Sequence, residues 1–330
     1  MKKTELVDKY NRHLNYLRVS ITDRCNLRCL YCAPGGLVPK LAHKEILRYE
    51  EILRIIRIGV DLGISKVRLT GGEPLMRAGV YDFIEELVAV DGLTDISLTT
   101  NGVMLYENIE KIEAAGIKRI NISLDTLNRK KFKHITGYDF FEQVWAGIEK
   151  AHALGFDPIK LNVVALKGYN DDEFVDLARL SMTYPFHIRF IEYMPIGNAQ
   201  MMSSDYILAP DIRALLSVLG DLVPVTRKHM DGPAQSYRIK GAKGEIGFIQ
   251  AMSQHFCHTC NRLRLTANGQ LRPCLLSDKQ LDIRGPLRSG ASDDELKAVF
   301  LRAVEHKHKS HHVAPGSLLR VHDSMSGIGG

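Results

Sequence analysis

Long hydrophobic runs are missing from this chain of 330 residues. No segment approaches the roughly 18 consecutive apolar residues that a membrane-spanning helix requires. The N-terminal segment, which begins Met1-Lys2-Lys3, also lacks the apolar core of a secretory signal peptide. We therefore expect a cytoplasmic protein that is neither inserted in a membrane nor exported.

Cysteine is scarce as well, because the chain has only six and they fall into two groups of three. This distribution argues against the disulfide framework of a secreted protein and for metal chemistry in a reducing compartment. A large excess of one charge is also missing, since the formal net charge is +6. That charge suits an anionic partner without distinguishing a nucleotide from a nucleic acid. With 45% hydrophobic and 25% charged residues, we expect one large or two smaller globular domains.

The first group of cysteines, Cys25, Cys29 and Cys32, lies in one short loop. Their spacing lets three thiolates converge on one soft metal centre, and iron–sulfur clusters are usually held by four cysteines. Three ligands would leave one iron open to a molecule other than protein. Zinc sites typically show pairs of ligands two residues apart and a complete set of four. The pattern therefore favours an iron–sulfur cluster over zinc or over three buried core cysteines.

Strands and helices alternate over the first part of the chain. A two-residue polarity period predicts strands at 16–22, 66–70, 95–100, 119–124, 159–165 and 187–193. A helical period predicts helices at 49–62, 81–90, 107–115, 141–154 and 171–181, each followed by a glycine except the last. This alternation predicts parallel strands joined by right-handed crossovers, either in an open doubly wound sheet or in a barrel.

Polar residues recur on one parity of these strands. Strand by strand they are Arg18, Ser20 and Thr22; Arg68 and Thr70; Ser97 and Thr99; Asn121 and Ser123; Lys160 and Asn162; Glu192 and Met194. Parallel strands covered by helices are normally apolar on both faces, so a recurring polar face predicts a lumen that holds a polar ligand. Loop motifs also collect after the strand ends, where barrel enzymes place catalytic groups. We therefore expect an α/β fold with an incomplete (β/α)6 TIM-type barrel.

Arg189 does not fit this polar face. It has the opposite parity to Glu192 and Met194 on the sixth predicted strand. A shifted register, a bulge or a purely structural role for Arg189 would each explain the mismatch.

The regular alternation ends near residue 198, so we divide the chain into residues 1–197 and 198–330. The second part is expected to be a smaller C-terminal α+β region that closes the open side of the barrel. It contains a predicted linker at 201–204, a helix at 208–219, a turn at 231–234 and short strands at 245–250, 263–266 and 270–274. Asn268-Gly269 predicts a hairpin between the last two strands.

The second group of cysteines, Cys257, Cys260 and Cys274, spans this hairpin. Its spacing fits a zinc ion and an iron–sulfur cluster equally well. Zinc accepts three cysteines and one histidine, and His255 or His258 would complete that set. An iron–sulfur cluster with one open iron fits the same three cysteines.

Several motifs resemble those of a known family. CxxxCxxC with Tyr31 before the last cysteine, and the Gly-Gly-Glu-Pro stretch at 71–74, resemble the radical S-adenosylmethionine (SAM) enzymes. The FCxxCNRxR run at 256–264, with TDRCNLRCLYC, TTNG, DGPA and the terminal glycines, resembles the GTP 3′,8-cyclases of molybdenum cofactor biosynthesis over nearly the whole chain. The resemblance implies a lyase that cyclises GTP to (8S)-3′,8-cyclo-7,8-dihydro-GTP, with SAM and two [4Fe–4S] clusters as cofactors.

The same resemblance implies roles for individual residues. The six cysteines hold the two clusters, and Arg262, Arg264, Gly329 and Gly330 take part in catalysis, the glycines because the tail enters the lumen. The implied SAM contacts are Tyr31, Gly72, Ser123 and Met194. The implied GTP contacts are Arg18, Arg68, Thr99, Lys160, Arg262, Leu263 and Arg264. Arginine suits this task because its planar fork matches phosphate oxygens and base edges.

The resemblance also implies partners. They are GTP, SAM, an electron donor of the flavodoxin or ferredoxin type, the next pathway enzyme (cyclic pyranopterin monophosphate synthase) and a second copy in a homodimer, with no membrane and no nucleic acid. The alternatives are a radical SAM enzyme acting on a peptide or RNA, and a zinc-stabilised binding module that is not an enzyme. A histidine-rich stretch at His306, His308, His311 and His312 is expected to be solvated.

Overall fold

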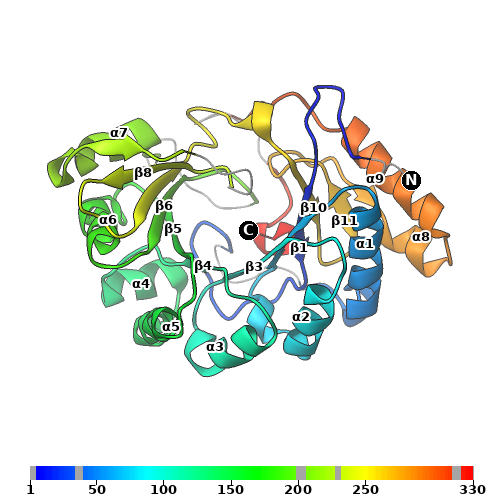
Figure 1. Ribbon diagram of the computed structural model, residues 1–330, viewed down its shortest axis with the longest axis horizontal. Helices are drawn as coiled ribbons and strands as arrows, with labels where there is room; N and C mark the ends of the chain where they lie inside the picture. Colours follow the sequence, from blue (N-terminus) through cyan, green and yellow to red (C-terminus); the bar gives the residue numbers. More distant parts are fainter. Residues whose placement is uncertain (1–4, 34–39, 198–205, 227–231, 314–320, 330) are drawn as a thin grey trace.

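The computed structural model describes residues 5–33, 40–197, 206–226, 232–313 and 321–329. Figure 1 shows a curved sheet with helices around its outer side and the C-terminus near its centre. Within the described ranges, no helix combines the length and the apolar character needed to cross a membrane. The linker predicted at 201–204 and the catalytic role of Gly330 fall outside these ranges.

Six parallel strands in sequence order form the centre of the sheet. They are β1 (Tyr16–Ser20), β2 (Lys66–Thr70), β3 (Asp95–Thr100), β4 (Ile120–Ser123), β5 (Ile159–Ala165) and β6 (His187–Glu192). Each predicted strand is found, and the bounds of β2, β3 and β5 are those predicted. Parallel neighbours need crossover connections, and the helices supply them. The predicted partial barrel of the TIM type is therefore confirmed.

The helices of the barrel cover the outer face of this sheet (Figure 1). They are α1 (Tyr49–Asp61), α2 (Val80–Val88), α3 (Leu105–Ala114), α4 (Arg129–Thr136), α5 (Phe141–Ala153) and α6 (Phe174–Thr183). Apolar residues at helical spacing, such as Ile52, Ile55 and Ile56 of α1, are buried in the main hydrophobic core. Helix α4 was not predicted, because its first residues are charged; the Asn128 side chain caps it by accepting from the Lys130 and Lys131 main-chain N–H groups.

The C-terminal residues extend both edges of the barrel sheet. The added strands are β7 (Leu222–Pro224), β8 (Gln235–Ile239), β9 (Glu245–Ile249), β10 (Arg262–Leu265), β11 (Gln270–Arg272) and β12 (Leu281–Asp282). Strand β10 pairs in parallel with β1, and β9 pairs in parallel with β6. The full order is β12-β11-β10-β1-β2-β3-β4-β5-β6-β9-β8-β7. Strands β10 and β11 form the predicted antiparallel hairpin. The division at residue 197 stays a prediction.

The remaining helices belong to the C-terminal part of the chain. They are α7 (Ala209–Leu216), α8 (Arg284–Arg288), α9 (Asp293–Glu305) and α10 (Met325–Ile328). Short 3-10 segments lie at His43–Glu45, Pro74–Met76, Asp171–Glu173, Ser217–Leu219 and Cys257–Thr259. Helix α9 packs against α1, so the end of the chain continues the outer helical layer of its beginning.

The register of the sheet corrects the predicted parity of the sixth strand. Arg189 is paired with Asn162 of β5, and in-register neighbours of a parallel sheet share a face. Arg189 therefore lies on the lumen face, and Glu192, three positions later, points to the other face. There the Glu192 carboxylate accepts from the main-chain N–H groups of Ala209 at 2.9 Å and Met252 at 2.8 Å. The expectation that Glu192 lines the lumen is thus wrong.

Candidate active site

The first cysteine group follows β1 and lines a cavity of about 960 Å³. Cys25, Cys29 and Cys32 form no disulfide and are all partly exposed. The same cavity is lined by four other predicted ligand contacts. They are Tyr31, Gly72 and Ser123, predicted to contact SAM, and Thr99, predicted to contact GTP. The loops after β1 to β4 thus converge on one hollow, as the carboxyl ends of barrel strands do.

Glycines allow the 71–74 loop to pass close to the cysteine loop. A Cβ atom on Gly71 would lie 2.6 Å from the Thr22 carbonyl oxygen, a separation that side chains do not tolerate. The two loops are joined by hydrogen bonds from the Gly72 N–H to the Thr22 carbonyl and from the Glu73 N–H to the Arg24 carbonyl, both 2.7 Å long. The Asn101 side chain adds a contact of 3.6 Å between its Nδ2 and the Cys25 Sγ. The cysteine loop is therefore held by neighbouring barrel loops.

Two buried carboxylates next to this cavity were not assigned a role from the sequence. Asp125 accepts from the Tyr31 hydroxyl at 2.8 Å and from the Val164 N–H at 2.8 Å. Glu73 accepts from the Thr100 hydroxyl and from the main-chain N–H of Asn101. Burial raises the pKa of Asp125 to about 6 and that of Glu73 to about 7, against the lowering effect of these hydrogen bonds. Burial, followed by Cys32 and Asp125, also raises the pKa of Cys29 well above its usual value.

The second cysteine group lies between two hollows at the opposite side of the barrel. Cys257, Cys260 and Cys274 line one cavity of about 530 Å³ together with Arg262 and Arg264. The three cysteines also line another of about 760 Å³. Met194, predicted as a SAM contact, lines the 530 Å³ cavity beside the second cysteine group. Met194 packs in the same hydrophobic cluster as Met325, which lines the first cavity, and its SAM contact stays a prediction.

Cations surround the second cysteine group. The Arg262 Nη2 lies 3.6 Å from the Cys260 Sγ. Lys307, which is 3% exposed, donates from its Nζ to the Arg262 carbonyl at 2.9 Å and to the Pro273 carbonyl at 2.6 Å. Although burial raises the pKa of Cys260, the charges of Arg262 and Lys307 lower it to about 6. Lys307 had no predicted role, and its place in a run of lysines and histidines gave no signal of burial.

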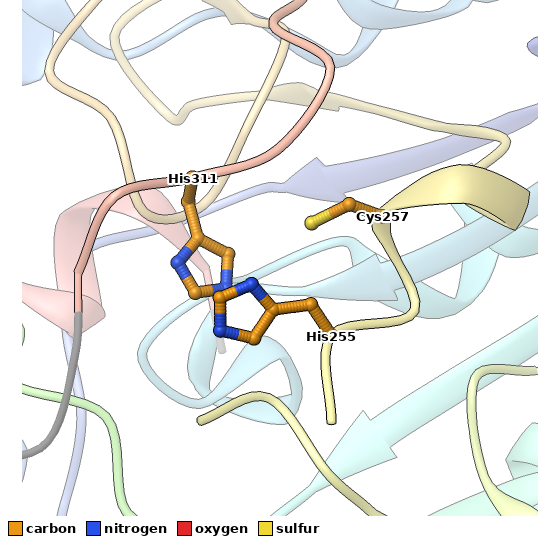
Figure 2. A group of neighbouring side chains, drawn as sticks. All are labelled: His255, Cys257 and His311. Atoms are coloured by element: carbon orange, nitrogen blue, oxygen red, sulfur yellow. The ribbon is translucent and has the colours of Figure 1, made fainter. Parts of the chain in front are cut away.

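The spacing of the thiols bears on which metal the cysteines hold. Among the described residues, the group of three potential ligand atoms within 4.8 Å of one another is His255, Cys257 and His311 (Figure 2), and neither set of three cysteines forms such a group. Tetrahedral zinc would bring its sulfur ligands roughly 3.8 Å apart, given a Zn–S bond of about 2.3 Å. The three thiols of each set are therefore not gathered as closely as a single zinc ion would require.

The predicted GTP contacts form a row of buried cations on the lumen face. Arg264, Arg18 and Arg68 are in register on β10, β1 and β2, and Lys160 lies further along the sheet on β5. Burial lowers the pKa of Arg18 to about 10. Burial, followed by Arg189, Arg68 and other cations, lowers the pKa of Lys160 to about 6. Such mutual repulsion in a buried lumen favours an anionic ligand.

The partners of these side chains strengthen that view. In the described part of the chain, Arg68, Lys160, Arg262 and Arg264 form no ion pair with a carboxylate, whereas Lys66 is paired with Asp95 at 2.6 Å. Nearby, the Thr99 Oγ1 and the Asn121 Oδ1 are buried with no hydrogen-bond partner among the described residues. Buried polar atoms are normally satisfied, so these atoms point to a missing polar ligand. The Leu263 side chain is fully buried in the core, which leaves only its backbone for a ligand.

The C-terminal tail runs between the two cysteine groups. The Ser326 main-chain N–H donates to the Cys32 thiol, and Met325 and Ser326 line the first cavity. The Gly329 carbonyl accepts from the Arg264 Nη1 at 2.6 Å. A Cβ atom on Gly329 would lie 2.9 Å from both the Ser20 Cβ and the Thr70 Cγ2, so the tail is wedged against β1 and β2. The predicted entry of the tail into the lumen agrees with this position of Gly329.

Comparison with known proteins identifies the family. A family model described as Radical SAM superfamily matches residues 19–181, and one described as Molybdenum Cofactor Synthesis C matches residues 186–313. A GTP 3′,8-cyclase of Moorella thermoacetica is 50% identical over 323 residues, covering 98% of this chain and 99% of that protein. The chain belongs to the GTP 3′,8-cyclase family. A second family member, from Thermodesulfovibrio yellowstonii, is 48% identical and covers 98% of this chain and 99% of its own length.

Solved structures show the same fold at low sequence identity. The crystal structure of Streptococcus suis SuiB bound to S-adenosylmethionine has a TM-score of 0.61 at 14% identity, covering 94% of this chain and 79% of SuiB. Native anSMEcpe with bound AdoMet has a TM-score of 0.57 at 15% identity, covering 89% of this chain and 81% of that protein. These similarities support the partial-barrel fold of this chain.

Proposed function

We propose that this chain catalyses the reaction for which its family is named, the cyclisation of GTP to (8S)-3′,8-cyclo-7,8-dihydro-GTP in molybdenum cofactor biosynthesis. The observation that carries the proposal is the row of buried cations on the lumen face. The first cysteine group follows β1, the strand that carries Arg18, and the second shares a cavity with Arg264. Arg264 links the row to the second group and, through the tail, to the first. A triphosphate would supply negative charge to Arg68, Lys160 and Arg264, which have no carboxylate partner among the described residues.

Two [4Fe–4S] clusters and SAM are the cofactors. Cys25, Cys29 and Cys32 hold one cluster, and Cys257, Cys260 and Cys274 hold the other. With SAM bound, the N-terminal cluster would supply one-electron radical chemistry for removal of hydrogen at C3′ of GTP, and a further electron and proton would complete the bond from C3′ to C8. Tyr31, Gly72 and Ser123 line the cavity in which SAM would bind. Met194, which packs in the same hydrophobic cluster as Met325 of that cavity, is the fourth proposed SAM contact.

The chain's own residues bind and orient the substrate. Arg18, Arg68, Lys160 and Arg264 hold the triphosphate, and Arg262 lies beside Cys260 where the base would dock. Thr99 offers its unpartnered hydroxyl to the same ligand. Fixing C3′ next to the radical carbon matters, because small errors of orientation lower rates steeply. Gly329, with its carbonyl on Arg264, positions that arginine and fills the lumen. A catalytic role for Gly330, which lies outside the described residues, rests on the family alone.

Three partners rest on the family alone. An electron donor of the flavodoxin or ferredoxin type would reduce the clusters, in keeping with a cytoplasmic location. The product would pass to cyclic pyranopterin monophosphate synthase. A homodimer is the proposed assembly.

Anaerobic turnover tests the proposal. Chain reconstituted with iron and sulfide should, with SAM and a strong reductant, release 5′-deoxyadenosine only when GTP is present, and the cyclised product should appear with it. A peptide library and a structured RNA serve as competing substrates. Deoxyadenosine that depends on peptide or RNA and not on GTP would contradict the proposal. A preparation with zinc and no acid-labile sulfide under the same reconstitution would favour a binding module.

A further inference from the structure

Two imidazoles lie beside one of the C-terminal cysteines. His255 and Cys257 come from the loop before β10, and His311 comes from the segment after α9. The ligand atoms of all three residues lie within 4.8 Å of one another. The two rings face each other with centroids 4.0 Å apart, and Figure 2 shows the Cys257 sulfur directed toward them. Two segments that are distant in sequence thus bring two nitrogen donors to one sulfur donor.

His311 is arranged as a metal ligand would be. Its Nε2 lies 2.9 Å from the Ala251 carbonyl oxygen, so this nitrogen carries the proton and donates it. Its Nδ1 is buried and has no hydrogen-bond partner among the described residues. Metal-binding histidines usually donate their other ring N–H to a carbonyl or carboxylate, which fixes the tautomer. The His311 main-chain N–H also donates to the Cys257 thiol, which holds the two residues together.

The spacing of these three ligand atoms suits a single metal ion and not a [4Fe–4S] cluster. With Zn–N near 2.0–2.1 Å and Zn–S near 2.3 Å, tetrahedral ligand atoms lie roughly 3.3–3.8 Å apart. Small side-chain rotations would bring His255, Cys257 and His311 from within 4.8 Å to that spacing. An imidazole on another iron of a cluster would lie further from the Cys257 sulfur, because the sulfur binds a different iron.

We propose that His255, Cys257 and His311 form a site for a single zinc-class divalent ion, which competes with the C-terminal cluster for Cys257. Binding forms one metal–sulfur and two metal–nitrogen bonds and releases the Cys257 thiol proton to solvent, and no electron is transferred. The fourth position is open to water, as in zinc sites with three protein ligands. The competition rests on the proposed cluster ligand set, whereas the metal site itself does not.

An entry path to the site is present. Cys257 and His311 line the hollow of about 760 Å³, which also reaches the exposed His308 and His312. Among the described residues, no histidine lines the cavity of the N-terminal cysteines. Zinc capture should therefore affect one of the two cysteine groups and spare the other.

Cobalt binding to the full-length, cluster-free chain tests the site directly. Anaerobic titration with Co²⁺ should give the visible bands of four-coordinate cobalt and a near-ultraviolet thiolate charge-transfer band, both lost on adding Zn²⁺. His255→Gln and His311→Gln should weaken this binding at least about tenfold. His258→Gln, on the exposed neighbour, should leave it unchanged. Unaltered cobalt spectra in both His255→Gln and His311→Gln would overturn the proposal.

Iron loading tests the competition without relying on GTP turnover. The zinc-free chain should take up roughly eight irons and the zinc-loaded chain roughly four, and the His255→Gln/His311→Gln chain should reach roughly eight in either case. Iron loading of the double variant without zinc also shows that it folds. Equal loading of the wild-type chain with and without zinc would overturn the competition. Failure of GTP cyclisation with these iron contents intact would count against the proposed function and leave the metal site standing.

Discussion

Each of the two cysteine groups has three thiols, but the charged residues around the two groups have opposite signs. The N-terminal group, which is partly exposed, lies near the carboxylates Asp125 and Glu73, and the pKa of Cys29 is raised well above its ordinary value by burial, Cys32 and Asp125. The C-terminal group is flanked by Arg262 and Lys307, which lower the pKa of Cys260 to about 6 against the effect of burial. Negative surroundings disfavour an added electron on a cluster and positive surroundings favour it. The N-terminal cluster should therefore be the stronger reductant, as cleavage of SAM requires.

Replacing one cysteine in each group should have the largest effect, and the two replacements should block different steps of the reaction. Cys29→Ala should abolish 5′-deoxyadenosine formation, because the cluster that binds and reduces SAM is lost. Cys274→Ala should retain SAM binding but yield no cyclised product, because the substrate side is lost. Liquid chromatography of deoxyadenosine and product from both variants measures the difference. Full turnover by Cys274→Ala would show that the second group has no part in the reaction.

The cations between the two groups predict proton uptake on GTP binding. Burial, Arg189 and Arg68 lower the pKa of Lys160 to about 6, so the free amine is mostly neutral at pH 8. A bound triphosphate raises this pKa, so up to about one proton is taken up and GTP affinity falls up to about tenfold per pH unit above pH 6. Calorimetry in buffers of different ionisation enthalpy measures the uptake.

The matched variants for this proton are Lys160→Met and Lys160→Arg. The first should lose both the uptake and most of the affinity, and the second should bind without the uptake. Lys167→Met, on an exposed lysine after β5, is the control. Uptake that persists in Lys160→Met would assign the proton to another group, such as the terminal phosphate.

The charge of Lys307 should make the C-terminal cluster easier to reduce. In the described part of the chain it has no carboxylate partner, and its charge acts on Cys257 and Cys260. Lys307→Met should make one-electron reduction of the C-terminal cluster about tenfold less favourable, equivalent to about 59 mV. A redox titration followed by electron paramagnetic resonance, in a chain with Cys25, Cys29 and Cys32 replaced by alanine, measures the shift.

Two further variants separate the charge of Lys307 from its packing. Lys307→Arg should keep the potential of the wild-type chain, and Lys309→Met, on an exposed neighbour, should not change it. Equal losses of the cluster in Lys307→Met and Lys307→Arg would show that shape, not charge, is what the site requires.

Asp125 is the group to test on the negative side of the comparison, beside the N-terminal cysteines. Its folded-state pKa of about 6 lies above the ordinary 3.8, so the unfolded chain loses this proton first as the pH rises. The free energy of unfolding should therefore fall between about pH 4 and pH 6 and stay lower above it. Asp125→Asn keeps hydrogen-bonding groups for Tyr31 and Val164. Between pH 4 and pH 8, the free energy of unfolding of this variant should rise relative to that of the wild-type chain by up to about 3 kcal/mol.

Urea unfolding of the cluster-free chain at the two pH values measures this difference. Asp139→Asn is the control with the opposite sign, because Arg129 lowers the pKa of that exposed carboxyl. A pH-independent difference between Asp125→Asn and the wild-type chain would mean that Asp125 does not titrate in this range.

Much of the barrel could be predicted from the sequence because its strands and helices follow simple periods. Every barrel strand was found within a few residues, since the polar lumen face and the glycines after the helices mark each unit. Helix α4 was missed because a charged start such as Arg129-Lys130-Lys131 hides a helical period. The wrong face for Glu192 has a similar cause: parity on one strand fixes no register without its neighbours.

The site was predictable where chemistry demands short-range spacing and less so where the fold brings distant residues together. The cysteines and the cation row follow from local motifs and from strand parity. Asp125 and Glu73 lie within the loops that the sequence marked out, but their burial could not be predicted because it depends on how several loops pack together. Lys307 and His311 reach the second cysteine group from the far end of the chain, and nothing in their local sequence predicts that contact.

The pairing of β10 with β1 has a consequence for synthesis of the chain. Tyr16 is paired with Arg262, so one edge of the central sheet stays uncovered until nearly the whole polypeptide has been made. At about 5–20 residues per second, this interval lasts roughly 12–50 seconds on the ribosome. An exposed edge of parallel strands is a template for aggregation, and the newborn chain should need chaperones during this interval. Strand β10 also carries Arg262 and Arg264, so the same late event that protects the edge completes the proposed GTP-binding surface.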